Sequence, residues 1–114
     1  SPHINNVTEA SFGELVLERS HRVPVLVDYW ADWCGPCQMQ MPVLLKLVEE
    51  HDGRLLLAKV NTDENPQYAI QYGVQGIPTM LFVKDGNLFD RIVEAAPKGA
   101  IQDRIDKMLE ALPQ

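Results

Sequence analysis

Cysteine and basic side chains are scarce in this sequence of 114 residues. It holds two cysteines and three histidines, and 10 Lys and Arg stand against 16 Asp and Glu, for a formal net charge of −6. A small fold stapled by disulfides needs more cysteines, so that class of protein is excluded. The shortage of cations argues against binding to a nucleic-acid backbone or to an anionic membrane surface. No apolar run approaches the roughly 18 residues of a membrane helix.

The rest of the composition is that of an ordinary globular protein, with 46% hydrophobic and 23% charged residues. The sequence shows no repeat, low-complexity tract or linker, and it is shorter than the roughly 150 residues typical of one domain. We therefore expect residues 1–114 to form a single domain. The first residues do not resemble a signal peptide, and we expect a cytoplasmic protein.

Hydrophobic periodicity predicts alternating helices and strands. Ser11 and Glu14 have the spacing of a capping box, which predicts a helix that buries Phe12, Leu15 and Val16. A second helix is predicted at about 35–50, with two buried apolar stripes. A short third helix is predicted to begin at Asn65 and Pro66. A fourth is predicted at about 99–112, with Leu112 on its buried face. Strands are predicted at 4–7, 23–30, 55–60, 79–83 and 88–93.

The order of these elements predicts an α/β fold. A strand, a helix and a second strand imply a parallel pair, whereas the Asp85-Gly86 turn between the last two strands implies an antiparallel hairpin. A central mixed β-sheet flanked by four helices follows.

Cys34 and Cys37 lie where the strand at 23–30 gives way to the helix at 35–50. As a structural disulfide they would close a short loop and contribute only about 2 kcal/mol. A structural zinc site needs four ligands, and the three histidines show no ligand spacing. A reversible dithiol fits the strand-to-helix setting best.

The position of the two cysteines predicts their chemistry. Cys34 lies at a helix N-terminus, where unpaired N–H groups and the helix dipole stabilise the thiolate that attacks a disulfide. Cys37 lies one turn into the helix, so we expect it to be less exposed. It would attack the mixed disulfide and release the reduced substrate.

Residues 27–37 (VDYWADWCGPC) resemble the active-site segment of thioredoxins. The resemblance extends over about residues 7–112 and includes the segments 58–61 (AKVN), 72–74 (YGV), 76–79 (GIPT) and the turn at 85–86. It implies a thioredoxin fold and a protein-disulfide reductase that needs no bound cofactor or metal. Electrons would come from NADPH through a flavin-containing thioredoxin reductase. The partners would be that reductase and disulfide-containing proteins, and we expect a monomer.

Asp28 interrupts an apolar strand, which is costly unless the carboxyl group is paired, protonated or solvated. From the residues alone, a bend that exposes Asp28 and a buried carboxyl with a raised pKa are equally good interpretations. The resemblance favours the second, in which Asp28 takes the proton of Cys37. It also places Lys59 close to the buried acid, where its charge would temper that pKa.

Four further residues are expected to bind the substrate. Trp33 precedes the nucleophile and would serve as an aromatic contact. Pro78 would be trans on base rates, but the resemblance implies a cis Ile77-Pro78 bond facing the cysteines. The Ile77 backbone would then pair with an extended substrate segment, and Gly76 would keep this surface open.

Three residues depart from the family pattern. Gln38 replaces a basic residue, Met41 replaces a small one, and Glu94 stands where glycine is usual on the docking surface. We expect Glu94 to add bulk and negative charge beside the substrate. Gln38 and Glu94 also fit an alternative, in which the chain is the N-terminal domain of a larger chaperone-type protein. There it would act as a client-binding and thiol-protecting module.

Overall fold

A computed structural model describes residues 1–113, so Gln114, the last residue of the expected domain, lies outside the described part. These residues form a five-stranded sheet in the order β1-β3-β2-β4-β5. The strands are β1 (Ile4–Asn6), β2 (Val25–Trp30), β3 (Leu56–Asn61), β4 (Thr79–Lys84) and β5 (Asn87–Ile92).

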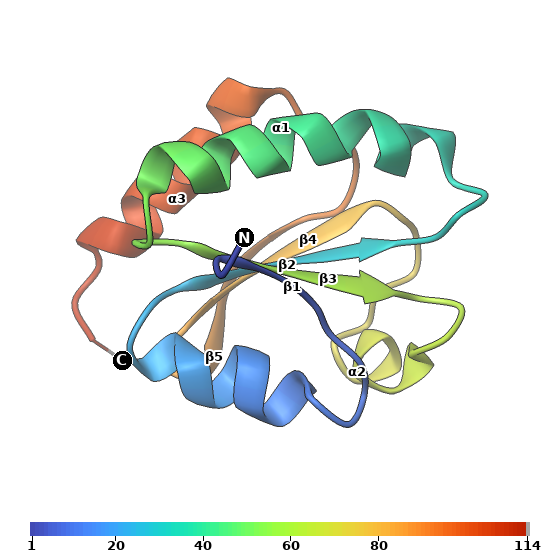
Figure 1. Ribbon diagram of the computed structural model, residues 1–114, viewed down its shortest axis with the longest axis horizontal. Coiled ribbons are helices and arrows are strands. Elements are labelled where there is room, and N and C mark those ends of the chain that lie inside the picture. Colours follow the sequence, from blue (N-terminus) through green and yellow to red (C-terminus); the bar gives the residue numbers. More distant parts are fainter. Residues whose placement is uncertain (114) are drawn as a thin grey trace.

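Helical segments cover both faces of this sheet (Figure 1). The long helix α1 (Gly35–His51) and α3 (Lys98–Glu110) lie on one face. The other face carries α2 (Pro66–Gln71) and an N-terminal segment made of the π-helix η1 (Gly13–Glu18) and the 3₁₀-helix η2 (Arg19–His21). The result is a three-layer α/β arrangement.

The pairing of the strands confirms the predicted mixed sheet. β3 pairs in parallel with β1 and β2, whereas β4 pairs antiparallel with β2 and β5. The hairpin turn between β4 and β5 has positive φ at both Asp85 and Gly86, as the Asp-Gly pair predicts. The fold is the α/β fold with a central mixed sheet that the sequence predicts.

The N-terminal helix does not begin as predicted. The N–H groups of Ser11 and Phe12 bond to the Thr8 carbonyl, and the Ser11 Oγ accepts a hydrogen bond from the Thr8 N–H at 3.0 Å. Ser11 therefore lies inside a turn that Thr8 opens, and the capping box with Glu14 is wrong. Phe12 and Val16 are nevertheless buried, because the apolar spacing is independent of the cap.

The prediction of two buried stripes on α1 is also wrong. Leu44, Leu47 and Val48 are buried, but Met39 is 80% exposed and Leu45 is 37% exposed. The helix lies on the surface of the sheet and buries one face only. Leu112 is likewise exposed, because α3 ends at Glu110.

Each face of the sheet has its own core. On the η1 and α2 side, the Phe12 ring stacks on Tyr68 with centroids 3.9 Å apart, and both pack near Tyr29. On the other side, α1 and α3 pack on the sheet through Leu44, Leu47, Ile101 and Ile105. The first turn of α1 projects past this second core, next to the end of β2.

Candidate functional site

Cys34 and Cys37 form a disulfide at the start of α1. Their Cα atoms are 5.3 Å apart. Cys34 is the N-cap residue of the helix, and its Sγ accepts a hydrogen bond from the Cys37 N–H at 3.2 Å. Pro36 lies in the first turn, where a missing N–H costs little. The sequence prediction that both sulfurs meet at a helix N-terminus is confirmed.

Both cysteines are almost covered. Cys34 is 3% exposed and Cys37 is 2% exposed. Cys37 is the less exposed of the two, as predicted, but the difference is very small. The neighbouring side chains are far more open, since Trp33 is 70% exposed. The sulfurs are therefore reached between the exposed side chains of Asp32, Trp33 and Gln38, and neither cysteine protrudes.

Asp28 is completely buried in β2. Neither carboxyl oxygen has a hydrogen-bond partner within residues 1–113. Burial raises the pKa of Asp28 to about 7, and the charge of Lys59 opposes this rise. The interpretation in which the strand bends and exposes Asp28 is wrong. An acid that titrates near neutrality can exchange a proton under ordinary working conditions.

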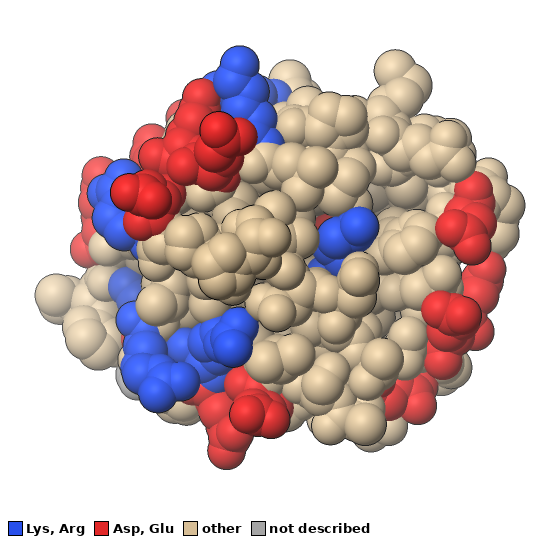
Figure 2. Space-filling view, viewed as in Figure 1, with Lys and Arg blue, Asp and Glu red and all other residues tan. Residues whose placement is uncertain are grey.

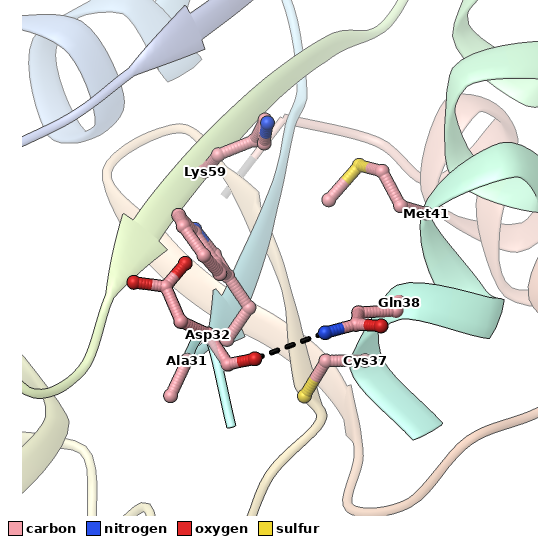
Figure 3. Close-up of a pocket in the computed structure, with 7 residues that line it drawn as sticks. Ala31, Asp32, Cys37, Gln38, Met41 and Lys59 are labelled. Atoms are coloured by element: carbon pink, nitrogen blue, oxygen red, sulfur yellow. Dashed lines mark hydrogen bonds between the residues drawn. The ribbon is translucent and has the colours of Figure 1, made fainter. Parts of the chain in front are cut away.

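Lys59 lies opposite Asp28 in the parallel pairing of β2 with β3. Its Nζ lies 5.6 Å from the centroid of the Trp30 ring, which is a cation–π distance. Lys59 lines a small hollow together with Cys37 and Met41, and Figure 3 shows its side chain on the opposite side of this hollow from α1. The structure thus places the lysine next to the buried acid and on one hollow with the second cysteine.

The departures Gln38 and Met41 line the same hollow. The Gln38 Nε2 donates to the Asp32 carbonyl at 2.9 Å, which ties the first turn of α1 to the end of β2 (Figure 3). Gln38, where the resemblance implies a basic residue, is a neutral side chain that braces the turn containing the two cysteines.

Trp33 is held by a residue that the sequence analysis missed. Its Nε1 donates to the Asp63 Oδ2 at 2.8 Å, and the two residues line a second hollow with Gly76 and Ile77. Asp63 follows β3, and the C-terminal ends of parallel strands meet at one edge. That rule was the available signal for a polar partner at this position.

The Ile77-Pro78 peptide bond is cis. The resemblance implied this isomer, and base rates alone would have given trans. A Cβ added to Gly76 would meet no described atom within 4 Å, so this surface is open to solvent. The structure thus brings Trp33, Gly76 and Ile77 onto one face.

Glu94 is exposed in the connection between β5 and α3. Val93 beside it is 64% exposed, and the following residues Ala95 and Ala96 share a hollow with Pro36 of the active-site turn. The connection therefore flanks the disulfide, and Glu94 adds a charge to it. Figure 2 also shows acidic atoms along the edge where β2 and β3 end, and the exposed Asp32 and Asp63 follow those strands.

Gln40 is a second residue that the sequence analysis missed. It is 3% exposed although it lies on α1, and it makes two hydrogen bonds to the backbone of Ala96. A glutamine three residues after Cys37 lies on the same side of the helix as that cysteine, which was the only signal in the sequence.

Two kinds of site are not found in the described part of the chain. Among residues 1–113, no three His, Cys, Asp or Glu side chains gather as metal ligands would. Within the same residues, no helix combines the length and the apolarity that crossing a membrane would need.

Comparisons with known proteins agree with this site. The thioredoxin family model matches residues 3–107. The chain is 48% identical over 103 residues to Thioredoxin 1 of Synechococcus elongatus, which covers 90% of this chain and 94% of that protein. It is 40% identical over 106 residues to a thioredoxin of Porphyra purpurea, which covers 93% of this chain and 97% of the relative.

A chloroplast protein is also similar. The M-type thioredoxin of Spinacia oleracea is 44% identical over 106 residues, which cover 93% of this chain and 58% of the spinach protein. With the Cys34–Cys37 disulfide at the start of α1, these similarities support thiol–disulfide exchange as the chemistry of the site. The chain belongs to the thioredoxin family, and it is a thiol–disulfide oxidoreductase.

Proposed function

We propose that this protein is a reductant of disulfides in other proteins, with Cys34 as the nucleophile and Cys37 as the resolving thiol. The observation that carries the proposal is the disulfide at the N-cap of α1, next to a strand that buries an acid with a pKa of about 7. The disulfide corresponds to the oxidised end of the cycle.

In the reduced protein, the Cys34 thiolate attacks one sulfur of the substrate disulfide. A mixed disulfide forms between Cys34 and the substrate, and the other substrate sulfur leaves as a thiolate. The Cys37 thiol then loses its proton and attacks the Cys34 sulfur. The second substrate thiol leaves, and the Cys34–Cys37 disulfide forms. Two electrons have passed from the dithiol to the substrate.

Asp28 accepts the Cys37 proton in this proposal. Its burial and its lack of a hydrogen-bond partner within residues 1–113 keep its pKa near neutrality rather than near 3.8. Lys59 lowers that pKa from the opposite strand, so it sets how readily Asp28 gives the proton up again. Lys59 and Cys37 line one hollow at the surface, and Asp28 lies beneath it, completely buried.

The substrate lies across the exposed apolar surface in this proposal. Trp33 provides an aromatic contact, and its hydrogen bond to Asp63 fixes the ring. The backbone around Gly76, Ile77 and Pro78 receives an extended substrate segment by strand addition. Glu94 selects against substrates with acidic residues at the facing position, because like charges repel there.

A flavin-containing thioredoxin reductase fed by NADPH restores the dithiol, and the protein itself carries no bound cofactor. We further propose that residues 1–114 act as one domain, as a cytoplasmic monomer. The comparisons favour this function over a chaperone-type module, because the similar proteins from Synechococcus elongatus and Porphyra purpurea are named thioredoxins.

Oxidation of NADPH by thioredoxin reductase, with insulin as the disulfide substrate, tests the proposal. We expect catalytic amounts of this protein to accelerate NADPH consumption, as an ordinary thioredoxin does in the same assay. No acceleration, with the Cys34–Cys37 pair shown by thiol titration to be reduced, would overturn the proposed reductase function.

The role of Asp28 needs a separate measurement. In Asp28→Asn, the first attack by Cys34 needs no new proton acceptor, whereas resolution by Cys37 loses its base. We expect single-turnover kinetics to show a slower decay of the mixed disulfide and a nearly unchanged rate of its formation. Equal slowing of both steps would argue against the proton transfer.

A further inference from the structure

The side chain of Gln40 joins the active-site helix to a distant loop. Its Nε2 donates to the Ala96 carbonyl at 3.1 Å, and its Oε1 accepts from the Ala96 N–H at 2.7 Å. One amide thus satisfies both backbone groups of one residue that is 56 positions away. Because Gln40 is only 3% exposed, water does not compete freely for these bonds.

These two bonds lie at a hollow that adjoins the disulfide. Pro36, Met39, Gln40 and Val43 of α1 line one side, and residues 95–97 line the other. Gln40 is three residues after Cys37, so the two side chains project from the same side of the helix. The loop is therefore fastened to the helix one turn beyond the reactive pair.

The fastened loop has no regular structure of its own. Residues 93–97 run from the end of β5 at Ile92 to the start of α3 at Lys98. A loop without strand or helix pairing relies on side chains to satisfy its backbone. Ala95, Ala96 and Pro97 line one hollow with Met39 and Val43, and apolar packing of this kind is non-directional, so it limits the position of the loop less than two hydrogen bonds do.

We propose that Gln40 is a positioning residue, which holds the loop 93–97 against the Cys-Gly-Pro-Cys turn and thereby sets how well protein disulfides are recognised. The inference rests on the proposed function, because the loop carries Val93 and Glu94 of the substrate surface. Without Gln40 the two sulfurs keep their places on α1, but the surface beside them becomes mobile. The loss therefore falls on large substrates and spares the exchange chemistry.

The first test compares two substrates in Gln40→Met, which keeps the length of the side chain and removes both hydrogen bonds. We expect the second-order rate constant for insulin to fall roughly tenfold, which is at the lower end of the net contribution of two hydrogen bonds. The rate with hydroxyethyl disulfide, which is too small to span the loop, stays within about twofold of wild type. The matched control is Gln71→Met on α2, an exposed glutamine for which both rates stay unchanged.

Gln40→Glu provides a rescue that a merely structural role would not give. Among the described residues, no ionisable side chain lines the hollow. Glu94 on the loop is exposed, and Glu50 and Lys98, at the adjoining ends of α1 and α3, already pair with each other at 2.8 Å. At about pH 8 the new carboxylate cannot donate to the Ala96 carbonyl, and at about pH 5 the protonated acid can. We expect the insulin defect, taken relative to wild type at the same pH, to shrink at the lower pH.

Amide hydrogen exchange reports directly on the hydrogen bond from the Ala96 N–H to Gln40. In the wild type we expect the Ala96 N–H to exchange slowly, and in folded Gln40→Met to exchange much faster. If the methionine variant does not fold, the wild-type exchange rate and the glutamate variant carry the test. An unprotected Ala96 N–H in the wild type, or equal losses with both substrates, would overturn the inference. Inactivity of the wild type itself would instead overturn the proposed function.

Discussion

The two ends of the sheet differ in how their side chains meet solvent and one another. At the end where β2 passes into α1, large apolar side chains are open to solvent, with Trp33 70%, Met39 80% and Val93 64% exposed. At the opposite end, where the hairpin joins β4 to β5, polar groups bind one another. The hairpin end contributes to stability, whereas the end where β2 passes into α1 leaves a surface for a partner.

The hairpin end satisfies its polar groups through η2 and α3. The Ser20 Oγ donates to the Leu17 carbonyl at 2.7 Å and accepts from the Gly86 N–H at 2.8 Å. The Asp85 N–H bonds to the Ser20 carbonyl at 3.0 Å. Lys84 donates from its Nζ to the carbonyls of Met108 and Ala111, which end α3.

Asp28, toward the site end, has no such partner among residues 1–113. An unpaired buried carboxyl costs free energy, and groups with strongly shifted pKa values cluster at functional sites, which agrees with the role proposed for Asp28. Polar groups at the site end also bind one another, as Trp33 does with Asp63, so the difference between the ends rests on the unpaired Asp28 and on the exposed apolar side chains. Substitutions at the two ends should therefore separate activity from stability.

The largest effect is expected for Cys34→Ser. A hydroxyl group is a far weaker nucleophile than a thiolate, so insulin reduction falls to the uncatalysed background. The check is NADPH consumption in the coupled assay, with circular dichroism to show that the fold is intact. Loss of the disulfide removes only about 2 kcal/mol from the stability of the oxidised protein.

Cys37→Ser is the partner variant, since it keeps the nucleophile and removes the resolving thiol. We expect it to accumulate mixed disulfides with substrate, visible as a shift in mass under non-reducing conditions. Sustained turnover by the Cys34 variant would show that the two cysteines do not have these roles.

The second effect concerns stability and has a definite sign. The pKa of Asp28 is about 7 in the folded protein against 3.8 ordinarily. Below about pH 4 the acid is protonated in both states, and the folded state loses nothing. As the pH rises toward 7 the unfolded chain releases the proton and the folded one keeps it, so stability falls by roughly 4 kcal/mol in total.

Asp28→Asn cannot ionise, so it should be the more stable protein at about pH 8, and its advantage should vanish near pH 4. Urea denaturation across this pH range measures the gap, which is the difference in unfolding free energy between Asp28→Asn and wild type. Asp103→Asn, at an exposed position of α3, is the matched control, and its unfolding free energy relative to wild type is measured over the same pH range. A gap for Asp28→Asn that is constant with pH would show that ionisation of the buried acid does not cause the difference in stability.

The sequence predicts the parts of this molecule that depend on short-range patterns. Alternation and helical spacing placed the strands, and the Asp85-Gly86 pair placed the hairpin. The position of Cys34 and Cys37 follows from a strand that leads directly into a helix. The cis bond before Pro78 was available only from the resemblance, because no local property of Ile77 demands it.

Features that depend on distant contacts were not predictable. Asp28 had two equal interpretations, because its burial is decided by the strands and helices around β2. The contact of Gln40 with Ala96 spans 56 positions and depends on where a loop passes a helix. The prediction of a helix cap at Ser11 is wrong because Thr8 begins the turn instead. Both residues are suitable helix caps, so only the packing of the folded chain decides between them.

At the hairpin end, Lys84→Met should lower stability by about 2 kcal/mol and leave insulin reduction unchanged. The ammonium group binds carbonyls at the C-terminus of α3, where the helix dipole also favours a positive charge. Lys107→Met in the last turn of α3 removes an exposed lysine and should change stability by less than about 0.5 kcal/mol. Equal effects of the two substitutions on the urea midpoint would show that the bonds from Lys84 contribute nothing.

The smallest effect is expected in the hairpin turn itself. Gly86 has a φ of 79°, and a Cβ there would approach the His21 Nε2 to 2.9 Å. Gly86→Ala should therefore cost about 1 kcal/mol from the left-handed backbone, and somewhat more from the contact. The His21 ring is exposed and can turn away, so adding His21→Ala should recover only the smaller part of the lost stability.

Gly99→Ala, in the first turn of α3 with open space around it, should instead raise stability by roughly 0.5 kcal/mol. We expect the two Gly→Ala changes to shift stability in opposite directions and to leave insulin reduction unaltered. That result would show that backbone strain at the hairpin end does not affect the chemistry at the Cys34–Cys37 end. A rise in stability in both variants would mean that the turn relaxes and that a side chain at position 86 causes no backbone strain.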